Sequence, residues 1–191
     1  MVASKELIET IADALITYKA RNIVLDPVMV STSGSRLIKE DAAEVLKECL
    51  MVLADLITPN IPETEVLTRM TVDSADSMEK AAIKIYENLK SKGGHAAVLV
   101  KGGHAVHTAN DCLCVDGRIV WLNGERVDNP NTHGTGCTLS SAIAANLAQG
   151  LPIEESVKAA KEYLTGAWKA GLNLGSGSGP LDHTYWLDIN K

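Results

Sequence analysis

Short apolar runs that alternate with amphipathic stretches constrain the fold of this chain most strongly. The short runs are rich in Val, Ile and Leu and stop at polar or turn-forming residues, as buried strands do; they cover 22–25, 55–57 and 96–100. The amphipathic stretches repeat apolar residues every three or four positions, as helices do; they cover 7–15, 40–53, 77–92 and 154–169. Strands that alternate with helices predict an α/β fold, with a doubly wound, mostly parallel sheet and flanking helices.

A hairpin is predicted after the third strand. The segments 111–115 and 118–122 are prone to form strands, and Asp116-Gly117 between them is a strong signal for a tight turn. No internal repeat or linker interrupts the 191 residues, a length that supports a substantial core. We therefore expect a single α/β domain over residues 1–191.

Composition and charge exclude several classes of protein. No apolar stretch has the length of a membrane-spanning helix, and no basic segment followed by an apolar run marks a secretory signal. The formal net charge of −6 argues against a nucleic-acid-binding surface. Of the four cysteines, only Cys112 and Cys114 are close in sequence; this is not a zinc spacing, and packing on one strand face is expected. The cytoplasm, where thiols stay reduced, is the location that this cysteine usage favours.

A glycine turn that opens a helix is the first candidate site. Gly134-Thr135-Gly136-Cys137 precedes a run rich in Ala and Leu, which is typical of a buried helix. The unpaired N–H groups at such a helix start attract anions, so Gly134, Thr135 and Gly136 are expected to hold phosphate oxygens. The same position stabilises a thiolate at Cys137. A lone cysteine is more often a small buried side chain, but the preceding Gly-Thr-Gly favours a functional role.

Polar residues follow the predicted strands directly. Ligands of open α/β sheets lie beyond the carboxyl ends of the strands, so Asp26, Asn60 with Glu63, and Lys101 are expected to converge with the glycine turn. Lys101 is suited to a nucleotide phosphate, and the oxygens of Asp26, Asn60 and Glu63 are suited to Mg²⁺. Structural alternatives remain open: Asp26 as a turn former, Glu63 as a first-turn helix residue, and Lys101 as an exposed loop side chain.

Four segments of the chain form a recognisable set: Val24–Met29, Thr58–Glu63, Val100–His104 and Asn131–Thr138. Together they resemble the hydroxymethylpyrimidine/phosphomethylpyrimidine kinases of thiamine biosynthesis, a family within the ribokinase-like superfamily. The Gly-Thr-Gly-Cys element is the most specific, because many ribokinase relatives carry Asp in place of Cys137.

The resemblance implies ATP and Mg²⁺, and phosphorylation of 4-amino-5-hydroxymethyl-2-methylpyrimidine and then of its monophosphate. It implies that Cys137 is the catalytic base and that Lys101 and Asp26 organise the charge at the nucleotide phosphates. It links Asn60 and Glu63 to Mg²⁺, and places Val28 and Met29 near the pyrimidine ring. It also implies a homodimer as the expected assembly.

The start of the chain aligns with an internal stretch of the family, so we expect an N-terminally truncated, C-terminal two-thirds of the family's domain. Part of the substrate pocket is then expected to be missing. Two alternatives follow from this: a pyridoxal kinase of the same Cys-type subgroup, and a non-catalytic nucleotide-binding fragment that needs the missing region.

Overall fold

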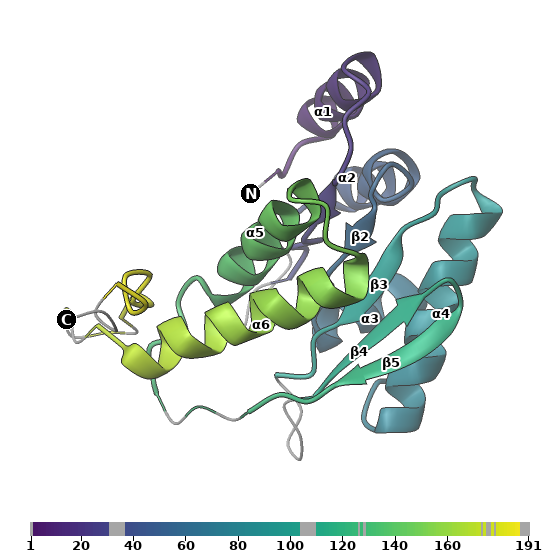
Figure 1. The fold of residues 1–191 in the computed structure, drawn as a ribbon. Helices are drawn as coiled ribbons and strands as arrows, with labels where there is room; N and C mark the ends of the chain where they lie inside the picture. The colour runs from purple at the N-terminus through teal and green to yellow at the C-terminus, as the bar shows by residue number, and fades with distance from the viewer. Residues whose placement is uncertain are drawn as a thin grey trace. The chain divides into compact units, whose positions relative to one another are not determined.

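The computed structural model describes residues 2–30, 37–103, 110–125, 127, 129–172, 174, 177 and 179–187. The polar segment 31–35, whose Ser, Thr and Gly residues predict a loop, lies outside these residues. The chain forms two compact units, Met1–Asn123 and Gly124–Lys191. The first unit contains a sheet with helices, and the second contains a pair of helices (Figure 1).

The first unit is built on a five-stranded sheet in the order β1-β2-β3-β4-β5. The first three strands are parallel, whereas β4 and β5 form an antiparallel hairpin that continues the sheet from β3. The sheet is therefore mixed, and the predicted α/β class and hairpin are confirmed. The strands are β1 (Val24–Leu25), β2 (Leu56–Ile57), β3 (Ala97–Val100), β4 (Asp111–Val115) and β5 (Arg118–Leu122).

The helices of the first unit follow most of the predicted amphipathic stretches. One stretch, 40–53, is divided into a short α-helix and a π-helical turn, and one helix, α3, was not predicted. They are α1 (Lys5–Thr17), α2 (Glu40–Val45), the π-helix η1 (Leu46–Leu50), α3 (Ile61–Thr68) and α4 (Ala75–Ser91).

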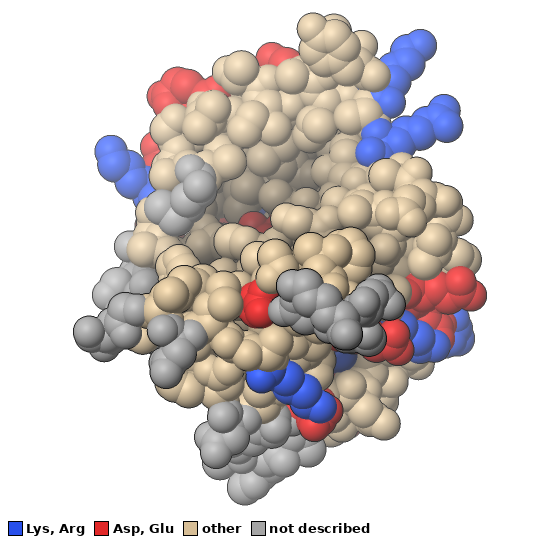
Figure 2. Space-filling view, turned by 60° about the vertical axis from the view of Figure 1, so that its left-hand side comes forward, with Lys and Arg blue, Asp and Glu red and all other residues tan. Residues whose placement is uncertain are grey.

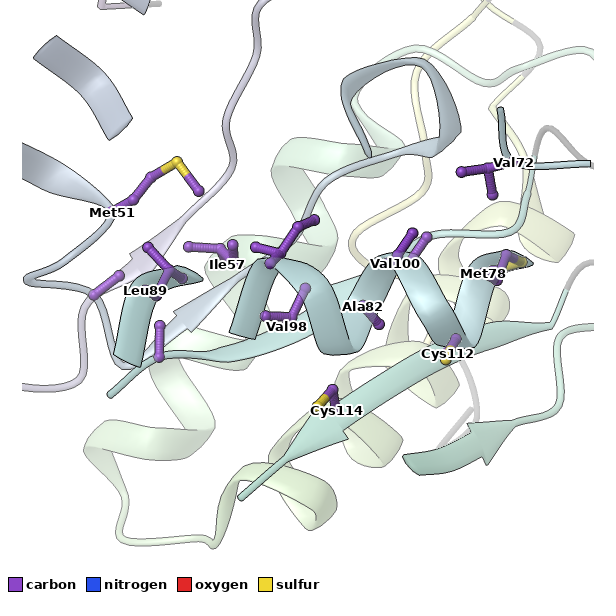
Figure 3. Packing of buried hydrophobic residues seen from close by; sticks show 14 residues of the cluster. Met51, Ile57, Val72, Met78, Ala82, Leu89, Val98, Val100, Cys112 and Cys114 are labelled. Carbon is purple, nitrogen blue, oxygen red and sulfur yellow. The ribbon is translucent and has the colours of Figure 1, made fainter. Parts of the chain in front are cut away.

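The main core of the first unit lies between α4 and one face of the sheet (Figure 3). Alternate residues of β3 and β4 point to this face, because side chains alternate along a strand. Cys112 and Cys114 are among them and are fully buried, as expected from packing. Burial is the largest of the causes that raise the pKa of the Cys112 thiol to about 12.

A second core cluster packs α1, α2 and η1 together. Ile8 and Ala12 lie on the inner face of α1, while Leu46 and Leu50 come from η1. Helix α1 begins directly after Ser4, whose side chain caps it by accepting a hydrogen bond from the Leu7 backbone N–H.

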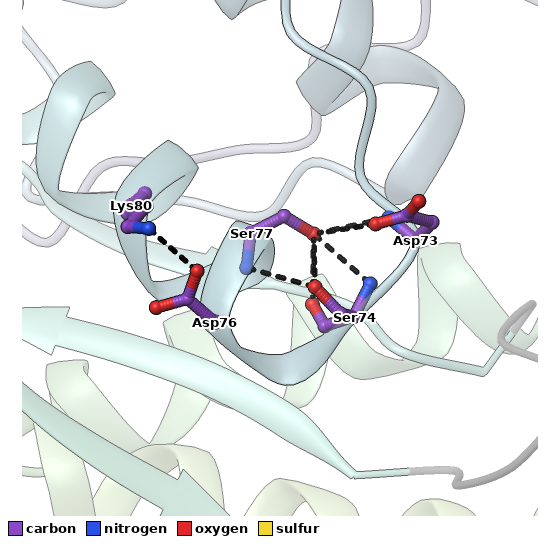
Figure 4. A network of polar contacts seen from close by, with 5 residues as sticks. All are labelled: Asp73, Ser74, Asp76, Ser77 and Lys80. Atoms are coloured by element: carbon purple, nitrogen blue, oxygen red, sulfur yellow. Dashed lines mark hydrogen bonds and ion pairs between the residues drawn. The ribbon is translucent and has the colours of Figure 1, made fainter.

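Helix α4 begins at a network of polar contacts (Figure 4). The Ser74 hydroxyl accepts from the Ser77 N–H, and the Ser77 hydroxyl accepts from the backbone N–H groups of Asp73 and Ser74. Lys80 and Asp76 add an ion pair of 2.6 Å one turn later. These caps satisfy N–H groups that a helix start leaves unpaired, so the helix begins two residues before the predicted position.

The second unit contains α5 (Thr135–Ala148) and α6 (Ile153–Ala170), which pack against each other. Gly134 precedes α5 with a φ of +85°, a left-handed conformation that glycine adopts without strain.

Among the described residues, no helix has the length and apolar character needed to cross a membrane. Acidic and basic side chains are interspersed on the face in Figure 2, in keeping with the small net charge.

Candidate functional site

Asp26 and Lys101 form an ion pair at the carboxyl ends of the parallel strands. Asp26 directly follows β1, and Lys101 directly follows β3. The Lys101 Nζ donates to Asp26 Oδ1 at 2.8 Å, and the side chains are only 16% and 15% exposed. Because removing two charges from water is costly, an isolated partner at this depth would be strongly destabilising. Lys101 is therefore not the freely exposed loop lysine that the sequence left open.

Asn60 and Glu63 begin α3 through reciprocal hydrogen bonds. The Asn60 Oδ1 accepts from the Glu63 N–H at 2.9 Å, and Glu63 Oε2 accepts from the Asn60 N–H at 2.8 Å. This capping box satisfies two backbone donors. Both residues thus have a structural role at the helix start, which was the alternative considered for Glu63.

Glu63 is also coupled to the ion pair. Glu63 is 2% exposed, and this burial raises the pKa of its carboxyl to about 7. Hydrogen bonds from the Asn60 and Met29 backbones and the charge of Lys101 lower the pKa, while Asp26 raises it. We refer to Asp26, Glu63 and Lys101 as the charge cluster.

The backbone explains why these residues meet. The Lys101 N–H donates to the Pro59 carbonyl at 2.8 Å, and Lys101 pairs with Asn60 as an isolated parallel bridge beyond β2 and β3. The N–H of Thr58, which follows β2, donates at 3.0 Å to the carbonyl of Leu25, the last residue of β1. Three of the four segments expected to converge therefore lie together within the first unit.

Val28 and Met29, expected near the substrate ring, differ in exposure. Val28 is half-buried, and its N–H donates to the Asp26 carbonyl at 2.9 Å. Met29 is 2% exposed, and its side chain packs in the cluster of α1, α2 and η1. In this structure Met29 is a core side chain whose backbone supports Glu63.

The oxygen atoms near the charge cluster suit a shared magnesium ion better than a metal centre made only of protein. Within the described ranges no group of three or more His, Cys, Asp or Glu is arranged to hold a metal. Asp26 and Glu63 nevertheless supply two carboxylates. Mg²⁺ is commonly held by one or two carboxylates, with water and substrate phosphate completing its shell. The donor chemistry is therefore compatible with Mg²⁺ carried by a nucleotide.

The glycine turn lies in the second unit and leaves an open helix start. Across the described part of the chain, no acceptor is found for the backbone N–H groups of Gly136 and Cys137, and the first turn of α5 carries no acidic side chain. Such a helix start favours an anion. Cys137 is exposed, so it is not the buried apolar cysteine of the structural alternative.

A cavity of about 600 Å³ lies beside Cys137 within the second unit. One wall contains Tyr163, whose hydroxyl lies 3.0 Å from His183 Nδ1, with the two rings stacked 6.0 Å apart. This aromatic pair was not predicted, because the residues are 20 positions apart and share no pattern. The lining residues are Cys137, Thr138, Ser141, Ala142, Ala145, Asn146, Ala159, Tyr163 and His183.

Comparison with known proteins gives consistent matches. Residues 1–182 match the family model described as phosphomethylpyrimidine kinase. The chain is 39% identical over 188 residues to the hydroxymethylpyrimidine/phosphomethylpyrimidine kinase of Haemophilus influenzae, a match that covers 96% of this chain and 68% of the relative. The chain therefore spans about two thirds of that relative's length.

Two solved structures are similar in fold. An ADP complex of Bacillus subtilis pyridoxal kinase has a TM-score of 0.86 and 35% identity, and the match covers 98% of this chain and 69% of that one. The phosphomethylpyrimidine kinase of Clostridium difficile 630 has a TM-score of 0.72 and 39% identity, with 86% and 65% covered. Both are kinases, and both share the α/β fold of this chain.

Proposed function

This chain belongs to the phosphomethylpyrimidine kinase family, and we propose on that premise that it acts in ATP-dependent phosphorylation of hydroxymethylpyrimidine and its monophosphate in thiamine biosynthesis. The observation that best supports this proposal is the charge cluster beyond the carboxyl ends of β1, β2 and β3. It places a partly buried lysine and two carboxylates where α/β proteins bind nucleotides.

In the first unit, Lys101 binds the phosphates of ATP as a point charge, because its ammonium is already oriented by Asp26. Asp26 and Glu63 would hold Mg²⁺, and Asn60 would contribute an amide oxygen. When bound, the ion neutralises the charge that develops on the phosphates. Occupancy by a cation also favours the ionised form of Glu63, because an opposite charge nearby stabilises a carboxylate.

In the second unit, the N–H groups of Gly134, Thr135 and Gly136 stabilise the phosphoryl oxygens during transfer. The Cys137 thiolate accepts the proton of the hydroxymethyl group as its oxygen bonds to the γ-phosphorus and the bond to ADP breaks. In the second reaction, the attacking atom is a phosphate oxygen of the monophosphate. Half-buried Val28 borders the pyrimidine, whereas the Met29 side chain packs in the core beside it.

Pyridoxal phosphorylation is the second candidate. The observation that favours it is the TM-score of 0.86 with the Bacillus subtilis pyridoxal kinase over 98% of the chain. Pyridoxal and hydroxymethylpyrimidine are both planar heteroaromatic alcohols, so the same groups serve either. Competition between the two substrates at equal concentrations decides the preference.

ADP release measured with each substrate, ATP and Mg²⁺ tests the proposed activity. Cys137→Ala is expected to reduce turnover by about 10²-fold or more, which is typical for loss of a general base. Cys49→Ala is the matched control, because Cys49 lies on η1 and has no role in the proposed reaction. Undiminished turnover in Cys137→Ala contradicts its role. ATP binding in calorimetry without any ADP release favours the nucleotide-binding alternative.

The family also suggests a homodimer in the cytoplasm, and both belong to this proposal. Light scattering over a range of protein concentrations checks the assembly. A monomer at the highest concentration contradicts the dimer.

A further inference from the structure

A buried carboxylate holds the backbone directly after Lys101. The Gly102 backbone N–H donates to Asp111 Oδ1 at 2.8 Å, nine residues later in the chain. Asp111 is the first residue of β4 and is only 6% exposed. A hydrogen bond to a charged, buried acceptor is among the stronger ones in proteins. The bond therefore pins the backbone next to Lys101 to the start of β4.

Gly102 is also confined by a close backbone approach. A Cβ atom at this position would lie 1.9 Å from the carbonyl oxygen of Asn110, which is far below any tolerated contact. The next residue is different, because a Cβ at Gly103 meets nothing within 4 Å. The two strand ends can approach this closely only because residue 102 lacks a side chain.

Lys101 is consequently held at three points. Its own N–H donates to the Pro59 carbonyl, its Nζ donates to Asp26, and the following N–H donates to Asp111. The first contact fixes the strand register and the second fixes the ammonium. The third contact fixes the direction in which the chain leaves Lys101, and it is the one that neither the charge cluster nor the family motifs include.

We propose that Asp111 is a positioning residue that acts through Gly102 to keep Lys101 in the charge cluster. It does not touch the reacting atoms. Its effect on phosphoryl transfer rests on the proposed function, whereas its effect on Lys101 does not. A misplacement of about 1 Å in a positioned group can lower a rate by about 10²-fold, so loss of the bond is expected to be felt in catalysis.

The first test measures the position of Lys101 without using activity. An amine-acylating reagent is applied to the folded 191-residue chain, and labelling of Lys101 is followed by peptide mass spectrometry relative to Lys80, whose side chain is 65% exposed. Asp111→Ala is expected to increase Lys101 labelling about tenfold, as a lost bond to a charged group allows. Asp111→Asn keeps an acceptor oxygen and is expected to restore protection.

A matched glycine pair keeps the test decisive if Asp111→Ala does not fold. Gly102→Ala is expected to increase Lys101 labelling in the same way, while Gly103→Ala is expected to leave it unchanged. Unchanged Lys101 labelling in both Asp111→Ala and Gly102→Ala overturns the proposal. Equal increases in Gly102→Ala and Gly103→Ala also overturn it, because they indicate an effect that does not depend on the close approach at Gly102.

The second test uses ADP release. Asp111→Ala is expected to raise the KM for ATP and lower kcat, Asp111→Asn to recover both, and the KM for the acceptor substrate to stay unchanged. A parallel rise in both KM values contradicts a role through Lys101. If the unsubstituted chain releases no ADP, the proposed function fails, and the labelling result still decides the role of Asp111.

Discussion

Replacing Glu63 with glutamine measures how much the ionisation of a buried carboxyl lowers the free energy of unfolding. Glu63 is 2% exposed, and burial raises its pKa from 4.5 to about 7. An acid with a raised folded-state pKa stabilises the fold while it is protonated, below the unfolded-state pKa. That stability is lost as the pH rises through the folded-state value. At about 1.4 kcal/mol per pKa unit, the loss amounts to about 3 kcal/mol.

Glutamine at position 63 keeps the neutral form at every pH and can still accept the capping hydrogen bond from Asn60. The free energy of unfolding of Glu63→Gln should therefore match that of the unsubstituted chain at about pH 4, below the unfolded-state pKa, and exceed it by up to about 3 kcal/mol at about pH 8. Urea denaturation at the two pH values, followed by circular dichroism, measures this difference. Glu87→Gln on α4 is the control, because Glu87 is exposed.

The reasoning is refuted if Glu63→Gln and the unsubstituted chain differ by the same amount at both pH values. A constant difference would mean that the substitution changes packing or the cap, and that the carboxyl ionises at its ordinary pKa. A ¹³C NMR titration of the Glu63 carboxyl gives the same answer directly, with a midpoint near 7 expected.

Two further predictions concern stability and thiol reactivity. Asn60→Ala removes the side-chain acceptor of the α3 capping box and is expected to lower the free energy of unfolding by about 1 kcal/mol; an unchanged urea midpoint contradicts this. With a thiol reagent at about pH 8, exposed Cys137 is expected to react fastest, and buried Cys112 and Cys114 only on unfolding. Peptide mapping of the labelled sites checks the order, and early labelling of Cys112 contradicts it.

Much of the first unit could be predicted from its apolar patterns, because its strands and long helices bury one regular set of side chains. Helix α3 could not be found in that way. Its buried side chains include Glu63, Thr64 and Thr68, which are polar, and the two threonine hydroxyls donate to carbonyls four residues earlier. The signal that was present was the Asn60 to Glu63 capping box, with Pro in the first turn.

The sequence could not predict the π-helical turn at 46–50, or the contacts between site residues far apart in the chain, for other reasons. A period of 3.6 residues describes an α-helix and does not anticipate an i to i+5 hydrogen-bond pattern. Topology predicted that Asp26 and Lys101 would approach, since both follow parallel strands. Nothing in the pattern marked Asp111, because its hydrogen bond to Gly102 depends on how the chain returns into β4.

The mixed sheet sets an order in which its pairs can form. Val115 pairs with Arg118 three residues later, whereas Leu56 pairs with Ala97 across 41 positions and with Val24 across 32. Closing longer loops costs more chain entropy, and hairpins form on a microsecond scale. The contact between Asp26 and Lys101 spans 75 positions and depends on the parallel pairs. A molecule that has made this contact has therefore closed the longest of these loops.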